Sequence, residues 1–147
     1  MLEPIRLDSI FERITNDKEI EAKILDLRRY AEIDKKIYTI NKKSLPYFCG
    51  STFVPKIRNT QNFVEANYFI IDLDNFESTE DLQNVFTNLK DDERISLMFV
   101  SPSNFGLKLV FTLLNPITDT KLFSDFYKCF IRRFAEEKGV QQFIDTV

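Results

Sequence analysis

The feature that most constrains the fold is a regular alternation of short apolar runs and amphipathic patterns after residue 66. The short runs are rich in β-branched and aromatic residues, which predicts strands. Two longer segments space apolar residues three and four positions apart behind a capping side chain, which predicts helices. The predicted elements are strands over 68–73, 95–100, 107–114 and 140–147, a helix after Ser78, and a helix from Asp119 to Gly139. This order predicts an α+β fold of the split βαβ, ferredoxin-like type.

The region before this alternation has a different character. Residues 17–41 carry apolar side chains on one stripe, which predicts an amphipathic N-terminal helix. Pro46, Gly50 and Pro55 then exclude a continued helix and leave room for short strands and turns. We therefore expect residues 1–66 to pack on a core formed by residues 67–147, as a single domain overall.

Composition excludes several classes of protein. The chain of 147 residues has a formal net charge of -3 and a pI near 5.1, which argues against coating nucleic acid by bulk electrostatics. No apolar run reaches membrane-spanning length, no secretory signal opens the chain, and the two cysteines form no CxxC pair, so we expect a cytoplasmic protein with free thiols. The absence of histidine excludes Ser-His and Cys-His catalysis.

Strand ends bring polar side chains from distant segments together. In a ferredoxin-like sheet, with spatial order four, one, three, two, the end of the first strand lies beside the starts of the third and fourth. Asp72 and Asp74 in FIIDLDNF, Lys108 and Asp145 therefore converge on one edge, which the SPSNFG turn also caps. We expect this edge to be the functional site.

The predicted set suits metal-assisted phosphoryl transfer. Two or three carboxylates, here Asp72 and Asp74 with Asp145, would hold a pair of hard divalent cations. Lys108 would add a positive charge for a triphosphate. The predicted phosphate nest consists of Ser101, Ser103 and the backbone amides from Asn104 to Gly106, with a positive φ available at Gly106.

Each of these assignments has a plainer interpretation. Asp72 and Asp74 are also ordinary residues for a strand end that becomes a turn, and SPSNFG is an ordinary hairpin connection. Lys108 fits a solvated edge lysine. A basic cluster of Lys42, Lys43, Lys56 and Arg58 is interpreted as solvated surface, with a contact to a template backbone as the alternative. The stripe Phe123, Phe126, Phe130 and Phe134 is interpreted as core.

Three blocks of the sequence carry a resemblance. KKSLPYFCGSTF, YFIIDLDNF and FVSPSNFGLKLVF, in this order, resemble blocks of the VirE N-terminal-like (BT4734-like) domains of the archaeo-eukaryotic primase, or prim-pol, superfamily, over roughly residues 20–147. The resemblance implies an RRM-like catalytic core and template-directed nucleotidyl transfer on single-stranded DNA or RNA with Mg²⁺ or Mn²⁺. It implies that Asp72 and Asp74 form the metal-binding motif.

The chain also departs from that superfamily. Lys108 stands where prim-pols usually carry histidine, so it keeps a positive charge but cannot act as a near-neutral acid or base. Asp145, in FIDTV, is the candidate third acid, and its predicted strand is incomplete at Val147. A later arginine-bearing segment of the family has no counterpart. We interpret the chain as a fragment, a truncated form or a degenerate relative.

Three functions remain open at this point. The first is a metal-dependent primase-polymerase acting on dNTP or NTP with a single-stranded template. The second is a non-catalytic nucleic-acid-binding or nucleotide-binding module of a replication or mobile-element protein, working with a helicase or an additional C-terminal domain. The third is a metal-dependent nuclease that uses the same carboxylates to activate water.

Overall fold

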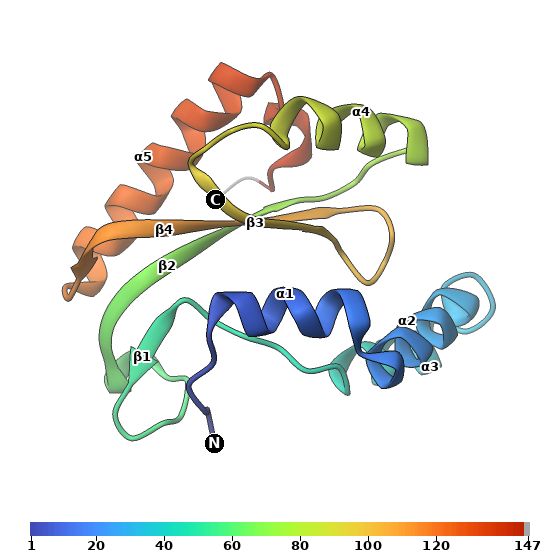
Figure 1. Cartoon of the computed structure of the whole chain (residues 1–147), viewed down its shortest axis with the longest axis horizontal. Helices are drawn as coiled ribbons and strands as arrows, with labels where there is room; N and C mark the ends of the chain where they lie inside the picture. The colour runs from blue at the N-terminus through green and yellow to red at the C-terminus, as the bar shows by residue number, and fades with distance from the viewer. Residues whose placement is uncertain (146–147) are drawn as a thin grey trace.

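A curled, four-stranded antiparallel sheet separates two layers of helices (Figure 1). The computed structural model describes residues 1–145 of the chain. The helices are α1 (Leu7–Asn16), α2 (Lys18–Tyr30), α3 (Lys35–Lys43), α4 (Thr79–Leu89) and α5 (Thr120–Lys138). The strands are β1 (Ser51–Phe53), β2 (Phe63–Leu73), β3 (Ile95–Val100) and β4 (Leu107–Ile117), and two short 3₁₀ helices are η1 (Thr60–Asn62) and η2 (Gln141–Phe143). The predicted α+β class is confirmed.

The strand order across the sheet is β1, β2, β4, β3. The strands predicted over 68–73, 95–100 and 107–114 are confirmed, although β2 begins earlier and β4 ends later than the apolar runs indicated. The register between β2 and β4 places Asp72 opposite Lys108 and Leu73 opposite Leu107. The connection between β3 and β4 therefore lies next to the end of β2.

The strand predicted over 140–147 is wrong within the described residues, because 140–145 contain η2 and no strand; 146 and 147 lie outside them. β1 takes the sheet position beside β2 that this strand was expected to fill. The physical reason is the spacing of apolar residues. Val140, Phe143 and Ile144 follow one another at steps of three and one, so a single turn of helix, and not a period of two, turns them toward the core.

The main core lies between the sheet and helices α4 and α5, and it is built around aromatic rings. Phe69 of β2 stacks on Phe111 of β4 with centroids 4.9 Å apart, and Phe130 of α5 meets Phe69 edge-on at 4.8 Å. Phe134 is almost completely buried. The interpretation of the α5 phenylalanine stripe as core is confirmed. This packing fixes which face of β2 is left for other side chains.

Two helices, α2 and α3, replace the single helix predicted over 17–41, and α1 precedes them. α2 ends at Tyr30. Asp34 then caps α3 by accepting hydrogen bonds from the backbone N–H groups of Lys36 and Ile37. The apolar stripe is consequently not continuous, and Ile33 and Ile40 are exposed. α1 packs against the second face of the sheet, where Ile10 meets a smaller cluster around Val110 and Leu97.

The predicted ends of the two core helices are confirmed. The Ser78 side chain accepts a hydrogen bond from Asp81 N–H, and the Asp119 side chain accepts one from Leu122 N–H. Gly139 ends α5 with a φ of 66°, in the left-handed region that favours glycine. Within residues 1–145, no helix has the length and apolar character needed to cross a membrane.

Candidate functional site

An ion pair between β2 and β4 marks the site predicted from the sequence. Lys108 Nζ lies 2.5 Å from Asp72 Oδ1, and the two residues are direct partners in the register. Phe69, Ile71 and Leu73 point to the main core, so the alternation of a strand turns Asp72 to the opposite face, toward the side of α1. About half of the Asp72 side chain and a third of the Lys108 side chain remain exposed. The pair is therefore accessible to a ligand.

Asp74 lies just past the end of β2 and is fixed through its backbone. Its N–H donates to the carbonyl of Phe143 at 2.8 Å, and the Phe143 ring stacks on Phe76 with centroids 4.1 Å apart. These contacts return the C-terminal segment to the end of β2. As a result Asp145, although it is not on a strand, comes within electrostatic reach of Asp74.

The pKa of Asp74 is shifted by burial and by the charged groups around it. Partial burial raises this pKa above its ordinary value, and the nearby negative charge of Asp72 raises it further. Lys108 opposes this effect, Asp145 adds to it, and Lys42 of α3 opposes it. The register and the ion pair thus place Asp72, Asp74 and Lys108 at one end of β2 and β4, and Asp145 is near enough to affect the pKa of Asp74.

The connection between β3 and β4, residues 101–106, forms a tight loop beside this rim; we call it the serine loop. Ser101 N–H donates to Gly106 O, which closes the loop at 2.8 Å. Ser101 is buried, with 7% of its surface exposed, and its hydroxyl lies 2.9 Å from the hydroxyl of Ser103. Asn104, and not Gly106, adopts the positive φ, at 70°. The expected conformational role of Gly106 is therefore wrong.

Gly106 has a different role, which is close approach. A Cβ atom at this position would lie 2.6 Å from Asp74 Oδ1, 2.8 Å from Leu73 O and 3.0 Å from Ser101 Oγ. Contacts this short leave no room for a side chain. The serine loop and the Asp74 carboxylate are thus packed directly against each other.

Part of the predicted phosphate nest is already satisfied within the serine loop. Asn104 N–H donates to Ser101 O, and Phe105 N–H donates to the Ser103 hydroxyl. In the described part of the chain, the N–H groups of Ser103 and Gly106 have no acceptor. These two amides and one serine hydroxyl are the donors that the loop could offer to a phosphate.

The acidic residues do not form a complete metal cage. Across residues 1–145, no group of three or more acidic, cysteine or histidine side chains is close enough to hold a metal ion. Asp72 and Asp74 nevertheless fit a hard divalent cation chemically, since both are carboxylates and their mutual repulsion raises the pKa of Asp74. The structure brings the two acids together and places Asp145 nearby without joining the three.

Two basic residues near the site were not assigned to it from the sequence. Arg28 of α2 donates from Nε to Pro102 O at 3.0 Å and from Nη2 to Ser101 O at 3.4 Å. Lys42, interpreted from the sequence as part of a solvated cluster, is exposed and also lowers the pKa of Asp74. No local pattern around Arg28 points to the serine loop more than 70 residues away, whereas the basic cluster was a signal for Lys42.

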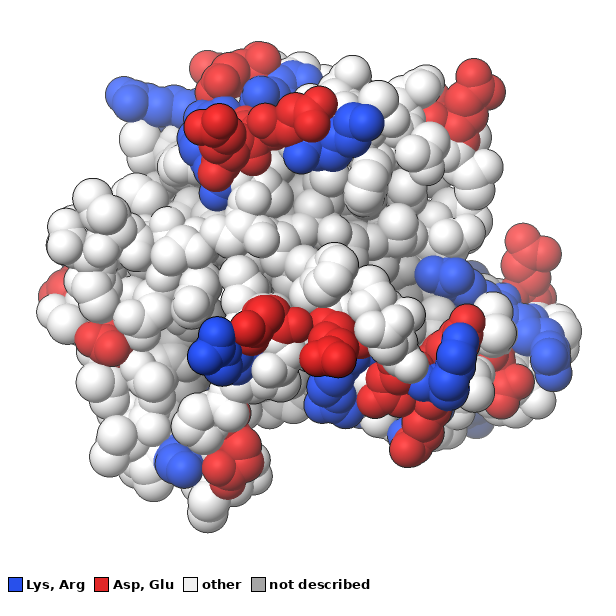
Figure 2. Space-filling model, viewed as in Figure 1, with Lys and Arg blue, Asp and Glu red and all other residues white. Residues whose placement is uncertain are grey.

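The charges on the face shown in Figure 2 are mixed in sign, in line with the low net charge of the chain. Figure 2 shows acidic and basic side chains interspersed along α1 and near the ends of the helices, with a broad band between them that carries neither. This face therefore has no continuous basic surface of the kind that binds nucleic acid non-specifically.

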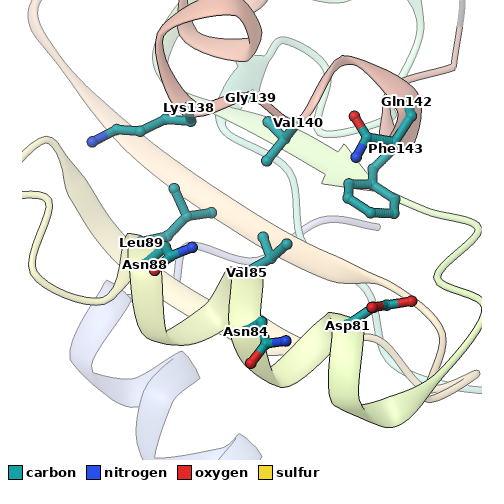
Figure 3. Close-up of a pocket in the computed structure, with 10 residues that line it drawn as sticks. All are labelled: Asp81, Asn84, Val85, Asn88, Leu89, Lys138, Gly139, Val140, Gln142 and Phe143. Atoms are coloured by element: carbon teal, nitrogen blue, oxygen red, sulfur yellow. The ribbon is translucent and has the colours of Figure 1, made fainter.

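Two surface cavities border α5 and the residues that follow it. One of about 200 Å³, between α4 and the end of α5, has Val85, Leu89, Val140 and Phe143 among its lining residues (Figure 3). None of the predicted site residues lines it. The other, of about 260 Å³, runs beside α5 and is bordered by Asp145 together with Lys128 and Arg132. Only the second adjoins the candidate site.

Comparison with known proteins gives a family. The profile described as "BT4734-like, N-terminal domain" matches residues 41–135. This range is narrower than the resemblance over residues 20–147; it includes Asp72, Asp74, the serine loop and Lys108 but excludes Arg28 and Asp145. Searches of curated proteins and of solved structures found no match. Since the profile covers more than half of the chain, the protein belongs to the BT4734-like, N-terminal domain family.

Proposed function

We propose that this domain is a metal-dependent nucleotidyltransferase of the prim-pol type, which extends or initiates a strand on a single-stranded template. The observation that carries the proposal is the meeting of Asp72, Asp74 and Lys108 beside the serine loop. Carboxylates for cations, an ammonium group and loop donors for phosphate oxygens are what transfer of a nucleotide from a triphosphate requires. Membership of the family supports this reading through the prim-pol resemblance.

The proposal includes a finer description of the fold. We interpret β2, α4, β3, β4 and α5 as an RRM-like core, in which β1 takes the edge position expected of a fourth core strand. The second face of the sheet is covered by α1 around Val110. The end of that face, where Asp72 and Lys108 remain exposed, is where we place substrate.

The residues would divide the work as follows. Mg²⁺ or Mn²⁺, held by Asp72 and Asp74 with Asp145 as the third acid, would neutralise the triphosphate and polarise the reacting phosphoryl group. Lys108 would exchange its partner Asp72 for a phosphate oxygen, which its flexible stem permits. The serine loop would donate its remaining N–H groups and a hydroxyl to other phosphate oxygens.

A second candidate is a non-catalytic nucleotide-binding or nucleic-acid-binding module that serves a helicase or another domain. One observation favours it: among residues 1–145 no three-acid metal group is formed, and Lys108 already neutralises Asp72. Such a module would bind triphosphate or single-stranded DNA and leave both unchanged.

Incubation of the protein with labelled dNTP, Mn²⁺ and a primed single-stranded template distinguishes the candidates. We expect the labelled strand to grow. We expect Asp72→Asn to reduce the rate by about a thousandfold or more, because charge stabilisation of the transition state is usually the largest catalytic contribution. Asp125→Asn, at an exposed position of α5, is the matched control. A strand that shortens identifies a nuclease, binding without turnover identifies the module, and full activity in Asp72→Asn rules out the metal assignment.

A further inference from the structure

Arg28 joins the N-terminal helices to the serine loop. It lies in the last turn of α2, is half-buried, and donates to the consecutive carbonyls of Ser101 and Pro102. The cartoon shows the β3–β4 connection directed toward the layer of N-terminal helices (Figure 1). The planar guanidinium can donate to two acceptors in a fixed geometry, which an ammonium group cannot.

These two hydrogen bonds orient the backbone of the loop. In a trans peptide the C=O and N–H groups point in opposite directions. Because Pro102 C=O points to Arg28, the N–H of Ser103 in the same peptide unit points away from α2. Within the described range this N–H has no acceptor. Arg28 therefore determines the direction of a free donor.

Anchoring of α2 does not by itself account for the contacts that Arg28 makes. Leu27, the preceding residue of α2, has no exposed surface and already anchors the helix. The next residue, Arg29, is largely exposed and pairs with Asp26, at 3.5 Å on its own helix. Two adjacent arginines thus have the same chemistry and different surroundings, and only one reaches the serine loop.

We propose that Arg28 is a positioning residue for the nucleotide site, holding the serine loop so that Ser103 N–H and one serine hydroxyl face the phosphates of a nucleoside triphosphate. Arg28 itself does not contact the nucleotide. This inference rests on the proposed function, and it makes the N-terminal helical layer part of the site. It also assigns a role to a residue outside the segment matched by the family profile.

The test compares Arg28→Ala, Arg28→Lys and Arg29→Ala with the wild-type protein. Dissociation constants for dATP are measured with Mn²⁺ at a temperature at which thermal unfolding shows every variant folded. Amide hydrogen exchange at residues 103–106 is measured without ligand. We expect Arg28→Ala to weaken dATP binding about tenfold and to speed exchange in the loop, in line with loss of charged hydrogen bonds. We expect Arg28→Lys to be intermediate and Arg29→Ala to match wild type.

The outcomes separate the inference from the proposed function. If wild type binds dATP and Arg28→Ala binds it equally well, the positioning role is overturned and the nucleotide site stands. If wild type does not bind dATP, the proposed function and the role assigned to Arg28 both fail. Faster exchange across the whole of β3 and β4, and not only at 103–106, also overturns the inference, because it indicates general loosening.

Discussion

Lys108 Nζ lies 2.5 Å from Asp72 Oδ1, so the cation expected to bind phosphate is held by a carboxylate expected to bind metal. This pairing keeps two acids near each other without a metal ion, since Lys108 also lowers the pKa of Asp74. On the proposed function, a metal ion would take Asp72 and a phosphate would take Lys108, so each ligand would compete with the ion pair for one partner.

Substitution of Lys108 should therefore change the two affinities in opposite directions. In Lys108→Met, Asp72 loses its positive partner, and we expect Mn²⁺ to bind about three- to tenfold more tightly. We expect dATP to bind about tenfold more weakly, because a phosphate loses an ammonium group. Titration calorimetry measures both. Lys121→Met, at an exposed position of α5, is the control, and affinities that change in the same direction would contradict the shared role.

The pH dependence of stability should identify Asp74. Its pKa is raised in the folded protein, so its ionisation opposes folding; its favourable contribution is complete below its ordinary pKa and is lost as pH rises through the raised value. We expect Asp74→Asn to melt about 1–3 °C above wild type at pH 7, and to lose this advantage near pH 3. Asp125→Asn serves as the control in thermal scans across this range. A variant that is less stable than wild type at pH 7 would refute the assignment.

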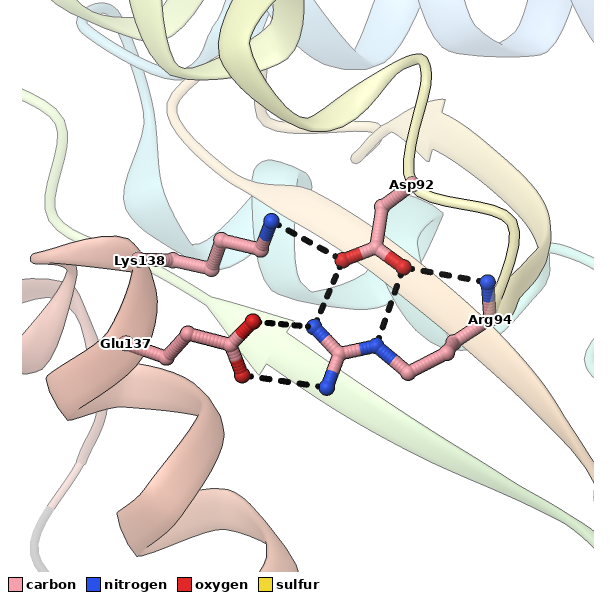
Figure 4. A network of polar contacts seen from close by, with 4 residues as sticks. All are labelled: Asp92, Arg94, Glu137 and Lys138. Carbon is pink, nitrogen blue, oxygen red and sulfur yellow. Dashed lines mark hydrogen bonds and ion pairs between the residues drawn. The ribbon is translucent and has the colours of Figure 1, made fainter.

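A second charged network, away from the site, should control stability. Arg94 donates to both carboxylate oxygens of Asp92 and to both of Glu137, and Lys138 pairs with Asp92 at 3.0 Å (Figure 4). The guanidinium also lies 5.4 Å from the centroid of the Phe134 ring. We expect Arg94→Lys to lower the free energy of unfolding by about 1–3 kcal/mol, because an ammonium group cannot reproduce these bonds.

The same network should weaken in acid. The hydrogen bond from Arg94 holds the pKa of Asp92 well below its ordinary 3.8. The stability gained is present above that ordinary value and is lost as pH falls below it. Chemical denaturation at pH 7 and pH 3 should therefore show a larger difference between wild type and Arg94→Lys at pH 7. Arg133→Lys, at an exposed position of α5, is the control. If wild type and Arg94→Lys differ in stability by the same amount at pH 7 and pH 3, the proposed mechanism is wrong.

Periodicity was sufficient to predict the elements that build the main core. The strands β2, β3 and β4 and the two capped helices each bury a regular face, so their patterns reflect their surroundings directly. Periodicity was misleading for residues 17–41, where steps of three and four continue across the break at Asp34. It was also misleading for residues 140–145, which are too few to distinguish a strand from a turn of helix.

The candidate site was predictable in part. The register between β2 and β4 follows from their apolar pattern, and that register places Lys108 opposite Asp72. The contact between Arg28 and the serine loop depends on how α2 packs beside the β3–β4 connection, which no local pattern encodes. The conformation of the loop was also missed, because both Asn104 and Gly106 can adopt a positive φ.

The absence of a side chain at Gly106 restricts how this region can vary between related chains. A methyl group there would collide with the Asp74 carboxylate and the Leu73 carbonyl at the end of β2, and with the Ser101 hydroxyl of the serine loop. At the tip of the loop, the positive φ of Asn104 favours asparagine or glycine, whereas the side chain of Phe105 is exposed and leaves that position free to vary. Because Gly106 packs directly against both the end of β2 and Ser101, a sequence change in either segment must preserve this contact. We therefore expect the end of β2 and the serine loop to vary together among related chains.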